Sequence, residues 1–495
     1  MEKNLKQLID LLPECQVQGA EDKMIQSIAH DSRKVVANTL FVCMIGATVD
    51  GHNYIEQAVK NGAVAVLVEK DVVVPKGVTV IRVQDMKASM QSIVPYFYDY
   101  PAQKMRMIGI TGTNGKTTTS YLIRAILKNA GFKVGIIGTI QIIIEDRVLP
   151  IHNTTPDVID LQSTLAEMVN SGIDYVVMEV SSHALAQERV DGCEFDTAVF
   201  TNVTQDHLDY HKTFENYIAA KAKLFASLVQ EGNVKTNKNA IINIDDEASK
   251  AMLANTKCNV LTYGVHHDAD IKAVDINVLA SGANFTAVGE FGSISLKLKI
   301  TGVFNVYNVM GAIGAALAEN VAKETIQATL EFFTSVPGRF ELVDEGQSFS
   351  VIVDYAHTPD GLENILKTAR QIAVNRIITV FGCGGDRDRT KRPIMGRIAT
   401  ELSDVIIATS DNPRTEDPEF ILSQVEAGVL EVLGDKQHEK ITDRKTAINR
   451  AIGMAEAGDI VIIAGKGHED YQILKDRTIH FDDKEIAREA IRGLK

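Results

Sequence analysis

Short apolar runs alternate with amphipathic stretches along most of this chain of 495 residues, and the alternation predicts strands separated by helices. Because the runs are apolar throughout, they are typical of parallel sheets with helices on both faces, so we predict an α/β fold. Residues 270–301 instead alternate polar and apolar positions around several glycines, which predicts a small antiparallel insertion. The predicted strands are 39–45, 64–69, 78–83, 107–111, 134–139, 175–180, 197–201, 240–244, 350–353, 376–381, 404–409 and 459–464.

Breaks in this pattern divide the chain into three segments. One break falls near Tyr100-Pro101, and a hinge is expected around Val336-Pro337-Gly338. The predicted domains are therefore a small mixed α/β domain at 1–102, a central domain at 103–335 and a Rossmann-like domain at 336–495.

The strand at 107–111 leads directly into a Gly-rich loop at 112–118 and then into a helix. Such a loop turns backbone N–H groups toward an anion, and the helix N-terminus adds positive charge. Lys116 can reach the outer phosphates of a nucleotide, and the Thr117 hydroxyl can bind Mg²⁺. Ile110 stands where the ordinary phosphate-loop pattern has glycine, so a turn without a ligand is the alternative. We expect a sheet of the P-loop ATPase type with helices on both faces.

Polar residues at the ends of neighbouring strands are candidates for the same site, because ligands of open parallel sheets lie at the carboxyl ends of the strands. Glu179, at the end of strand 175–180, is placed to hold Mg²⁺; Ser181 or Ser182 capping a helix is the simpler interpretation of this stretch, and both can hold. After strand 197–201 comes a polar cluster with Asp206 and His207, which the sequence alone leaves between a ligand and a solvated pair.

The last segment has three strand-end loops of unusual composition. A loop rich in glycine and arginine follows strand 376–381, an Asp-Asn-Pro-Arg turn follows 404–409, and Gly-Lys-Gly-His-Glu follows 459–464. The first fails the spacing of a dinucleotide fingerprint, and the second also fits a turn into a helix capped by Asp417. Four arginines near Gly-rich backbone suit an anionic substrate group: Arg387, Arg389, Arg392 and Arg397. Arginines and a glutamate on three such loops predict one polar pocket for a zwitterion.

Composition narrows the class of protein. The chain is 45% hydrophobic and 23% charged, as ordinary globular proteins are, and its net charge of −14 argues against non-specific nucleic-acid binding. Five scattered cysteines without a CxxC pair predict reduced thiols rather than disulfides or a zinc site. No apolar run is long enough to cross a bilayer, and the N-terminus lacks the apolar stretch of a signal peptide. We expect a cytoplasmic monomer that is not membrane-embedded.

Taken together, the motifs resemble those of the Mur ligase family, which builds the peptide of bacterial peptidoglycan precursors. The resemblance covers essentially the whole chain. Besides the phosphate loop, it rests on Asp31-Ser32-Arg33, Asn153-Thr154-Thr155, Glu179-Val-Ser-Ser-His183, Asp206-His207, Ala220-Lys221, Asn305, Asn308, Pro337-Gly338-Arg339, Asp354-Tyr-Ala-His357, Asp386-Arg387-Asp388, Asp411-Asn-Pro-Arg414 and Gly465-Lys-Gly-His-Glu469.

The resemblance implies an ATP-dependent ligase with Mg²⁺ and with CO₂ bound as a carbamate on a lysine. Thr117 and Glu179 are implied to serve one Mg²⁺, and His207 and Lys221 a second, with Lys221 as N6-carboxylysine; Lys223 close by leaves this assignment open. The implied catalytic residues are Lys116, Glu179, His207 and Lys221. The implied ATP-binding residues are Gly112, Thr113, Asn114, Gly115, Lys116, Thr117, Thr118, Asn305 and Arg339.

The implied substrates are small molecules, a UDP-sugar peptide for the first domain and an amino acid for the last. The implied residues for the nucleotide sugar are Ser32, Asn153, Thr154, Thr155, Ser181, Gln187 and Arg189. Those for the amino acid are Arg387, Asp411, Asn412, Pro413, Arg414, Gly465 and Glu469.

Arg414 favours one amino acid. A guanidinium binds a carboxylate through two parallel hydrogen bonds, and meso-2,6-diaminopimelate has a distal carboxylate that L-lysine lacks. The motifs are accordingly most similar to those of members that add meso-diaminopimelate to UDP-N-acetylmuramoyl-L-Ala-D-Glu through an acyl phosphate. An L-lysine-adding member, a folylpolyglutamate-synthase-like ligase and a nucleotide-binding regulator without ligase activity are the alternatives.

Overall fold

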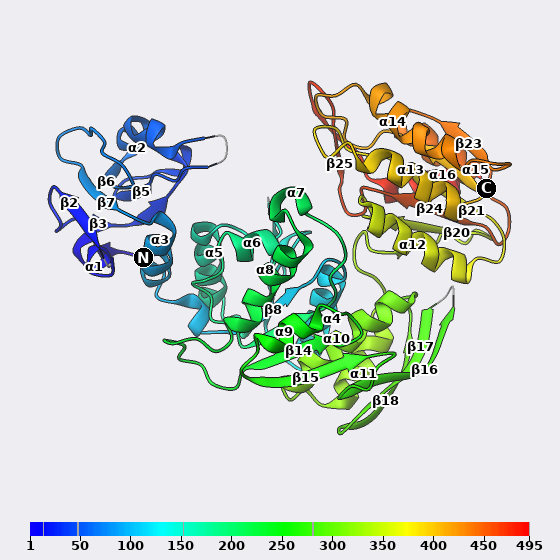
Figure 1. The fold of residues 1–495 in the computed structure, drawn as a ribbon, viewed down its shortest axis with the longest axis horizontal. Helices are drawn as coiled ribbons and strands as arrows, with labels where there is room; N and C mark the ends of the chain where they lie inside the picture. Colours follow the sequence, from blue (N-terminus) through cyan, green and yellow to red (C-terminus); the bar gives the residue numbers. More distant parts are fainter. Residues whose placement is uncertain (13, 47–48, 152, 280–281, 495) are drawn as a thin grey trace.

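The computed structural model describes residues 1–12, 14–46, 49–151, 153–279 and 282–494. Its large sheets have five, eleven and six strands, and they occur in that order along the chain. Each sheet forms the centre of one lobe, and the central lobe lies between the N-terminal lobe, in blue, and the C-terminal lobe, in orange and red (Figure 1). The predicted α/β class is confirmed.

The N-terminal lobe is a five-stranded sheet in the order β2-β7-β6-β5-β4, in which only β2 is antiparallel to its neighbour. Its core also contains Val158 and Ile159 of the central lobe, so the two lobes share apolar contacts. The elements are β1 (Lys3–Asn4), α1 (Leu5–Ile9), β2 (Cys15–Gln18), β3 (Met24–Ile25), β4 (Ser27–Ala29), η1 (Ser32–Lys34), β5 (Thr39–Val42), η2 (Gly51–Tyr54), α2 (Ile55–Asn61), β6 (Ala63–Val68), β7 (Thr79–Val83), α3 (Met86–Phe97) and η3 (Pro101–Gln103).

The central lobe is built on the eleven-stranded sheet, in the order β11-β10-β9-β12-β8-β13-β14-β15-β16-β17-β18. Strands β9 to β16 in this order are parallel, and apolar cores lie on both faces of the sheet. Its strands are β8 (Arg106–Thr111), β9 (Val134–Ile137), β10 (Ile142–Ile144), β11 (Arg147–Leu149), β12 (Tyr175–Glu179), β13 (Thr197–Phe200), β14 (Asn239–Asn243), β15 (Asn259–Gly264), β16 (Ile271–Leu279), β17 (Gly282–Gly289) and β18 (Gly292–Leu298). Its helices are α4 (Lys116–Asn129), α5 (Val158–Asn170), α6 (Ser182–Ala186), α7 (Leu208–His211), α8 (Phe214–Ala226), α9 (Ser249–Ala254), α10 (Val303–Ala318) and α11 (Lys323–Phe332).

The order of these strands places the Gly-rich loop at the middle of the sheet. The first strand of the lobe, β8, pairs with β12 on one side and β13 on the other, so chain connections leave it in both directions. Crevices at such a point are where open α/β sheets bind ligands. The carboxyl ends of these three strands are therefore where Glu179, the Gly-rich loop and the Asp206-His207 cluster meet.

The C-terminal lobe has the order β19-β20-β24-β21-β22-β23, parallel except for β19, with apolar cores on both faces. Asp417 caps α14 with Pro418 at its first position, as predicted. The elements are β19 (Glu341–Leu342), β20 (Ser350–Asp354), α12 (Pro359–Ile372), β21 (Ile377–Phe381), α13 (Lys391–Leu402), β22 (Val405–Ala408), α14 (Pro418–Glu431), β23 (Gln437–Lys440), α15 (Arg444–Gly453), β24 (Ile460–Ala464), β25 (Tyr471–Ile473), β26 (Thr478–His480) and α16 (Asp483–Arg492).

Every predicted strand is present, with ends that differ by a few residues. The predicted antiparallel segment is present as β16, β17 and β18, and it continues the central sheet, because β16 pairs in parallel with β15. Residues 280–281 of that segment lie outside the described residues. The hairpin β10–β11 and strands β15 and β23 were not predicted; β23, Gln-His-Glu-Lys, has a polar sequence because it forms the edge of its sheet.

Candidate active site

The predicted phosphate loop is a tight turn between β8 and α4. Gly112 and Gly115 have φ angles of +156° and +85°, which glycine adopts without strain. A Cβ on Gly112 would lie 1.8 Å from Thr201 Oγ1, and one on Gly115 would lie 2.3 Å from Asn308 Oδ1. The loop therefore needs glycine for close packing as well as for conformation.

Hydrogen bonds with Asn202 and Lys116 hold the loop in place. Asn202, just after β13, accepts the Thr113 N–H on its main-chain oxygen at 2.8 Å and the Asn114 N–H on Oδ1 at 2.9 Å. Lys116 is the first residue of α4, and its Nζ donates to the carbonyls of Gly112 and Thr113, each at 2.8 Å. The Lys116 side chain thus folds back over the loop, where its ammonium group can bind a phosphate group.

Glu179 at the end of β12 reaches the start of α4. Its Oε2 accepts hydrogen bonds from the hydroxyls of Thr117 at 3.0 Å and Thr139 at 2.9 Å, and its Oε1 accepts the Thr139 N–H at 3.0 Å. The carboxylate is buried. A hydroxyl and a carboxylate oxygen this close are the hard ligands that Mg²⁺ prefers, so Thr117 and Glu179 fit one Mg²⁺. Among the described residues, no group of three or more His, Cys, Asp or Glu is placed to hold a metal.

Lys221 and Lys223 lie on the same helix, α8, in opposite environments. Lys221 is 1% exposed, donates from Nζ to the Gly112 carbonyl at 2.8 Å, and lies 4.4 Å from the centroid of the Tyr217 ring; Lys223 is exposed. Burial, and then the charge of Lys116, lower the pKa of Lys221 well below its usual value. The structure therefore separates the two lysines that the sequence left open, and it favours Lys221.

His207 immediately precedes the short helix α7 and has a left-handed φ of +54°. Its Nε2 lies 3.3 Å from Asp206 Oδ2, and its ring packs edge-on against His183 with centroids 4.7 Å apart. Burial lowers the pKa of His207, although Asp206 opposes the shift. A neutral imidazole is the form that binds a metal ion, so this environment suits the role the family resemblance implies.

Residues from beyond the hinge close the other side of the loop. Arg339 Nη2 lies 3.3 Å from Thr117 Oγ1, and its guanidinium lies 4.7 Å from the Tyr355 ring centroid.

Asn305 donates to the Thr301 carbonyl at 2.8 Å and accepts from Asn308 Nδ2 at 3.0 Å. Asn308, rather than Asn305, lines the cavity beside the loop, so Asn305 acts there by holding its neighbour.

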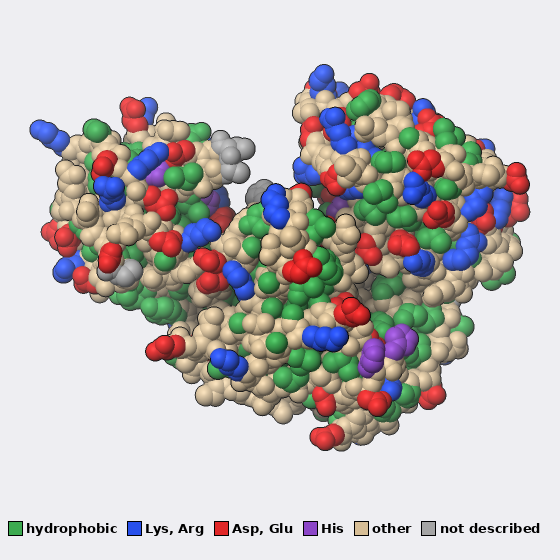
Figure 2. Space-filling view, viewed as in Figure 1, with side chains coloured by type: hydrophobic (Ala, Val, Ile, Leu, Met, Phe, Trp, Pro, Cys, Tyr) green, Lys and Arg blue, Asp and Glu red, His purple; other side chains and the backbone are tan. Residues whose placement is uncertain are grey.

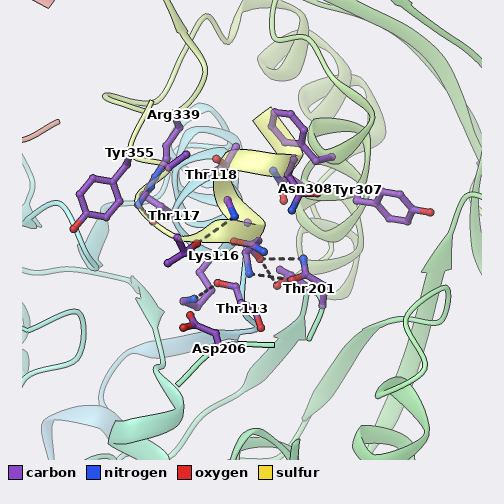
Figure 3. A pocket seen from close by; sticks show the side chains of 18 of the residues that line it. Thr113, Lys116, Thr117, Thr118, Thr201, Asp206, Tyr307, Asn308, Arg339 and Tyr355 are labelled. Atoms are coloured by element: carbon purple, nitrogen blue, oxygen red, sulfur yellow. Dashed lines mark hydrogen bonds between the residues drawn. The ribbon is translucent and has the colours of Figure 1, made fainter. Parts of the chain in front are cut away.

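These groups surround a cavity of about 540 Å³ between the central and C-terminal lobes. In Figure 3, Arg339 and Tyr355 lie on one side of Lys116 and Thr117, and Tyr307 lies on the other. The volume and the mixture of apolar and polar walls suit a nucleotide-sized ligand. The lining includes Thr113, Asn114, Gly115, Lys116, Thr117, Thr118, Glu179, Asp206, His207, Tyr307, Asn308, Arg339, Tyr355 and His357.

Four of the predicted nucleotide-sugar residues form one hydrogen-bonded group next to Glu179: Thr155, Ser181, Gln187 and Arg189. Thr155 Oγ1 donates to the Glu179 carbonyl at 2.8 Å and accepts the Ser181 N–H at 3.1 Å. Arg189 donates to the Thr155 carbonyl at 3.0 Å and to Gln187 Oε1. Ser181 also caps α6, so the simpler prediction for this stretch is confirmed as well.

Within the part of the chain that the structure describes, the other three predicted nucleotide-sugar residues, Asn153, Thr154 and Ser32, do not bond directly to that group. Thr154 reaches the group through Thr139, whose hydroxyl oxygen is 3.2 Å from its own. Asn153 is exposed. Ser32 lies on η1 of the N-terminal lobe, where its carbonyl accepts from Asn61 at 2.8 Å, and Lys34 on the same turn reaches Asp160 of α5 at 3.2 Å. Ser32 thus lies where the N-terminal lobe meets the central one.

The three strand-end loops of the C-terminal lobe meet, as predicted. Asn412 Nδ2 donates to Glu469 Oε2 at 2.9 Å, and Arg414, after Pro413, donates from Nη1 to the carbonyl of Gly385 at 3.0 Å. A Cβ on Gly465 would lie 2.9 Å from Asp411 Oδ2. One edge of the sheet therefore presents carboxylates, an amide and a guanidinium together, which suits a zwitterion.

The four predicted arginines do not all face this edge. Arg387 is exposed beside Gly384, whose Cβ would lie 3.7 Å from Arg387 Cγ and 3.0 Å from Arg414 Nη1. Arg392 is wholly buried and pairs with Glu416 at 2.9 Å. Arg389 also pairs with Glu416, at 3.1 Å, and Arg397 pairs with Glu431. Only Arg387 of the four remains suited to an anionic group, since ion pairs within the lobe occupy the other three.

The sequence assigned no role to several residues that the site uses, although Asn202 and Tyr217 belong to the polar cluster that follows strand 197–201. Thr139, the last residue of predicted strand 134–139, holds Glu179, and Asn202, just after predicted strand 197–201, holds the loop, so their position at strand ends could have identified these roles. Tyr217 lies under Lys221, four residues away on α8. Asp360, which reaches the loop from α12, gave no local signal because its partner Asn114 is distant in the sequence.

Known proteins resemble the chain along its whole length. The Mur ligase family catalytic domain matches residues 24–98, the Mur ligase middle domain residues 110–316, and the Mur ligase glutamate ligase domain residues 338–467. A UDP-N-acetylmuramoyl-L-alanyl-D-glutamate–2,6-diaminopimelate ligase from Bacillus cereus is 49% identical over 489 residues, which is 99% of this chain and 98% of the relative. The protein of that name from Geobacillus thermodenitrificans is 47% identical over 488 residues, 99% of each chain.

A solved structure of a ligase with the same name has a TM-score of 0.71 at 33% identity, and the match covers 100% of this chain and 99% of that one. The fold and the site, with these similarities, define an amide-bond-forming ligase. The chain belongs to the Mur ligase family. Among the described residues, no helix combines the length and apolar character needed to span a membrane.

Proposed function

We propose that this enzyme joins meso-2,6-diaminopimelate to the D-Glu carboxylate of UDP-N-acetylmuramoyl-L-Ala-D-Glu, with cleavage of ATP to ADP and phosphate, in peptidoglycan biosynthesis. The observation that carries the proposal is the meeting of Asp411, Asn412, Arg414 and Glu469 at one sheet edge, in a chain 49% identical to a relative named for this activity. Arg414 supplies the guanidinium that a distal carboxylate requires.

In the first step the D-Glu carboxylate attacks the γ-phosphate of ATP and becomes an acyl phosphate, which gives it a leaving group. Two anions must approach, so positive charge at the loop lowers the barrier. Lys116 follows the phosphates, and Arg339, beside Thr117, reaches the same place from the hinge. Mg²⁺, when bound, would neutralise phosphate charge; Thr117 and Glu179 would hold one ion, and His207 and Lys221 a second.

Lys221 could hold a cation only after modification. The neutral amine attacks CO₂ to form a carbamate, one N–H proton passes to solvent, and the side chain becomes an anion. The burial of Lys221 favours the neutral amine that this reaction needs.

In the second step the amine of diaminopimelate attacks the acyl phosphate and phosphate leaves through a tetrahedral intermediate. Arg414 and Asn412 would orient the distal carboxylate of diaminopimelate, and Glu469 and Asp411 would orient its ammonium group. Thr155, Ser181, Gln187 and Arg189 would hold the nucleotide-sugar substrate against Glu179. We further propose that the enzyme is a cytoplasmic monomer of three domains, since one chain supplies residues for every substrate.

Phosphate release with ATP, Mg²⁺ and UDP-N-acetylmuramoyl-L-Ala-D-Glu tests the proposal, with meso-diaminopimelate and L-lysine compared at equal concentrations. Turnover with diaminopimelate alone supports it. Turnover with L-lysine keeps the ligase class and overturns the choice of amino acid. Turnover with neither, but with a folate and glutamate, would favour the folylpolyglutamate-synthase-like alternative.

A further inference from the structure

Lys466 is a buried lysine at the centre of the amino-acid loops, and the residues assigned above to the substrate do not include it. It follows β24, between Gly465 and Gly467, and its side chain has no exposed surface. Lysine is almost never fully buried without partners, so its environment needs a reason.

The ammonium group of Lys466 has a partner for each of its hydrogens. Nζ lies 2.6 Å from the Tyr471 carbonyl, 3.0 Å from Asn412 Oδ1 and 3.4 Å from Glu469 Oε2. A lysine ammonium has three donors and no acceptor. With three partners and no exposure, Lys466 has no hydrogen left for a substrate, so any role in binding is indirect.

These contacts determine which way the Asn412 amide points. Its Oδ1 accepts from Lys466 and from the Ile473 N–H at 2.9 Å, and both of these groups only donate. Its Nδ2 donates to Glu469 Oε2 at 2.9 Å. A flipped amide would place Nδ2 against two donors and Oδ1 against a carboxylate, so the observed orientation is strongly preferred.

The same ammonium lies among the carboxylates of the pocket. Asp411 Oδ1 is 3.6 Å from Nζ, in addition to the contact with Glu469. A second buried cation, Arg444, lies near Gly465, which would place a Cβ 3.8 Å from Arg444 Nη2, but its guanidinium is paired with Asp483. Lys466 Nζ therefore lies within 3.6 Å of both carboxylates, which favours keeping Asp411 and Glu469 close together.

We propose that Lys466 is a positioning residue for the amino-acid substrate: it orients the Asn412 amide and holds the Glu469 carboxylate so that both meet the distal end of diaminopimelate. This rests on the proposed function, which takes Asn412 and Glu469 as substrate contacts. The Asn412 Nδ2 group has two hydrogens, of which Glu469 takes one, so the second is left to donate to a substrate carboxylate while Glu469 accepts from the substrate ammonium.

The test is steady-state kinetics of the full-length K466M variant, with K436M as the matched control. Lys436 donates to the carbonyls of Thr400 and Glu401 before β23, at the opposite edge of the same sheet. We expect K466M to raise KM for diaminopimelate about tenfold or more, as expected when a charged hydrogen-bond donor is lost, while KM for ATP stays within about twofold. K436M should change neither constant.

A double-mutant cycle with Asn412→Ala separates positioning from a general loss of packing. If Lys466 acts through Asn412, the double variant should raise KM for diaminopimelate little more than either single variant does. Fully additive effects, or an unchanged KM in K466M, would overturn the proposal. If K466M lacks the melting transition and the ADP affinity of the wild type, the N412A variant alone decides. An unchanged KM for diaminopimelate in N412A would show that Asn412, through which Lys466 is proposed to act, does not contact the substrate, and would overturn the proposal. A wild type inactive with diaminopimelate would instead overturn the proposed function.

Discussion

Lys221 and Lys223 are two residues apart on α8 and differ in almost every physical respect. Lys221 is buried against Tyr217 and the Gly112 carbonyl, whereas Lys223 faces solvent. Lys116 donates to the same carbonyl, so two amines meet at one oxygen. Burial, and then the charge of Lys116, disfavour a second ammonium group there and lower the pKa of Lys221.

We expect Lys221→Ala to lower the rate of phosphate release at least about 100-fold, because it removes the group proposed to help hold a cation at the phosphates. Lys223→Ala is the control and should retain the wild-type rate, since Lys223 is exposed on the same helix. Equal losses in the two variants would show that the helix, rather than the buried amine, matters.

The difference in stability between Lys221→Met and the wild type should depend on pH in CO₂-free buffer. The unfolded lysine has a pKa of about 10.4, and the folded value is lower, so below pH 10 the unfolded state binds more protons and stability of the wild type rises with pH. Methionine removes this term. The variant should therefore have a larger free energy of unfolding than the wild type at pH 7, and this gain should shrink as the pH rises toward 10. A gain independent of pH would contradict the assignment.

At the scale of elements, the site depends on one turn that joins β8 to α4 and packs against α10. Gly115 combines φ of +85° with a Cβ position 2.3 Å from Asn308 Oδ1. Gly131, just beyond the other end of α4, has a similar φ of +94° but open space around its Cβ position. Alanine at Gly131 would therefore cause backbone strain alone, whereas alanine at Gly115 would cause backbone strain and a clash with Asn308.

Gly115→Ala should raise KM for ATP about tenfold or more, because the new methyl group displaces Asn308 and with it the wall of the cavity. Gly131→Ala carries the strain alone, about 1–2 kcal/mol, and should lower the melting temperature without changing KM. Initial rates over a range of ATP concentrations, with a melting curve for each variant, check both outcomes. Matching KM values in the two variants would show that the Asn308 contact is unimportant.

At the scale of the whole molecule, α12 of the C-terminal lobe reaches the phosphate loop of the central lobe. Asp360 Oδ2 accepts from Asn114 Nδ2 at 2.6 Å and from Thr204 Oγ1 at 2.8 Å. These two hydrogen bonds link the C-terminal lobe, which carries the amino-acid loops, directly to the phosphate loop and its surroundings. Positive and negative side chains are interspersed over the face of the lobes shown in Figure 2.

Asp360→Ala should lower kcat/KM for the amino acid about tenfold and increase the radius of gyration in solution, because two hydrogen bonds to a charged group that join the lobes are lost. Glu363→Ala is the control on the same helix, where Glu363 pairs with Lys367 within one lobe. Kinetics combined with small-angle scattering check the prediction. A compact, fully active D360A enzyme would show that the lobes are held by other contacts.

The pattern of apolar runs was enough to predict the fold class and the strands around the site. A strand such as β13, Thr-Ala-Val-Phe, is buried on both faces and therefore apolar throughout. Edge strand β23 was missed because its polar residues face solvent and carry no such signal. The pairing of β16 with β15 was missed because partners in a sheet are chosen by tertiary contacts, which leave no trace in a local window.

The sequence by itself determined the phosphate loop, the strand-end motifs and the family, because these depend on residues adjacent in the chain. Only the tertiary structure decided which lysine of α8 is buried, that Asn308 rather than Asn305 lines the cavity, and that Arg392 and Arg397 are occupied by Glu416 and Glu431. The physical reason is the same in each case. Burial, protonation and hydrogen-bond partners are set by groups brought together from distant parts of the chain, and local sequence does not contain them.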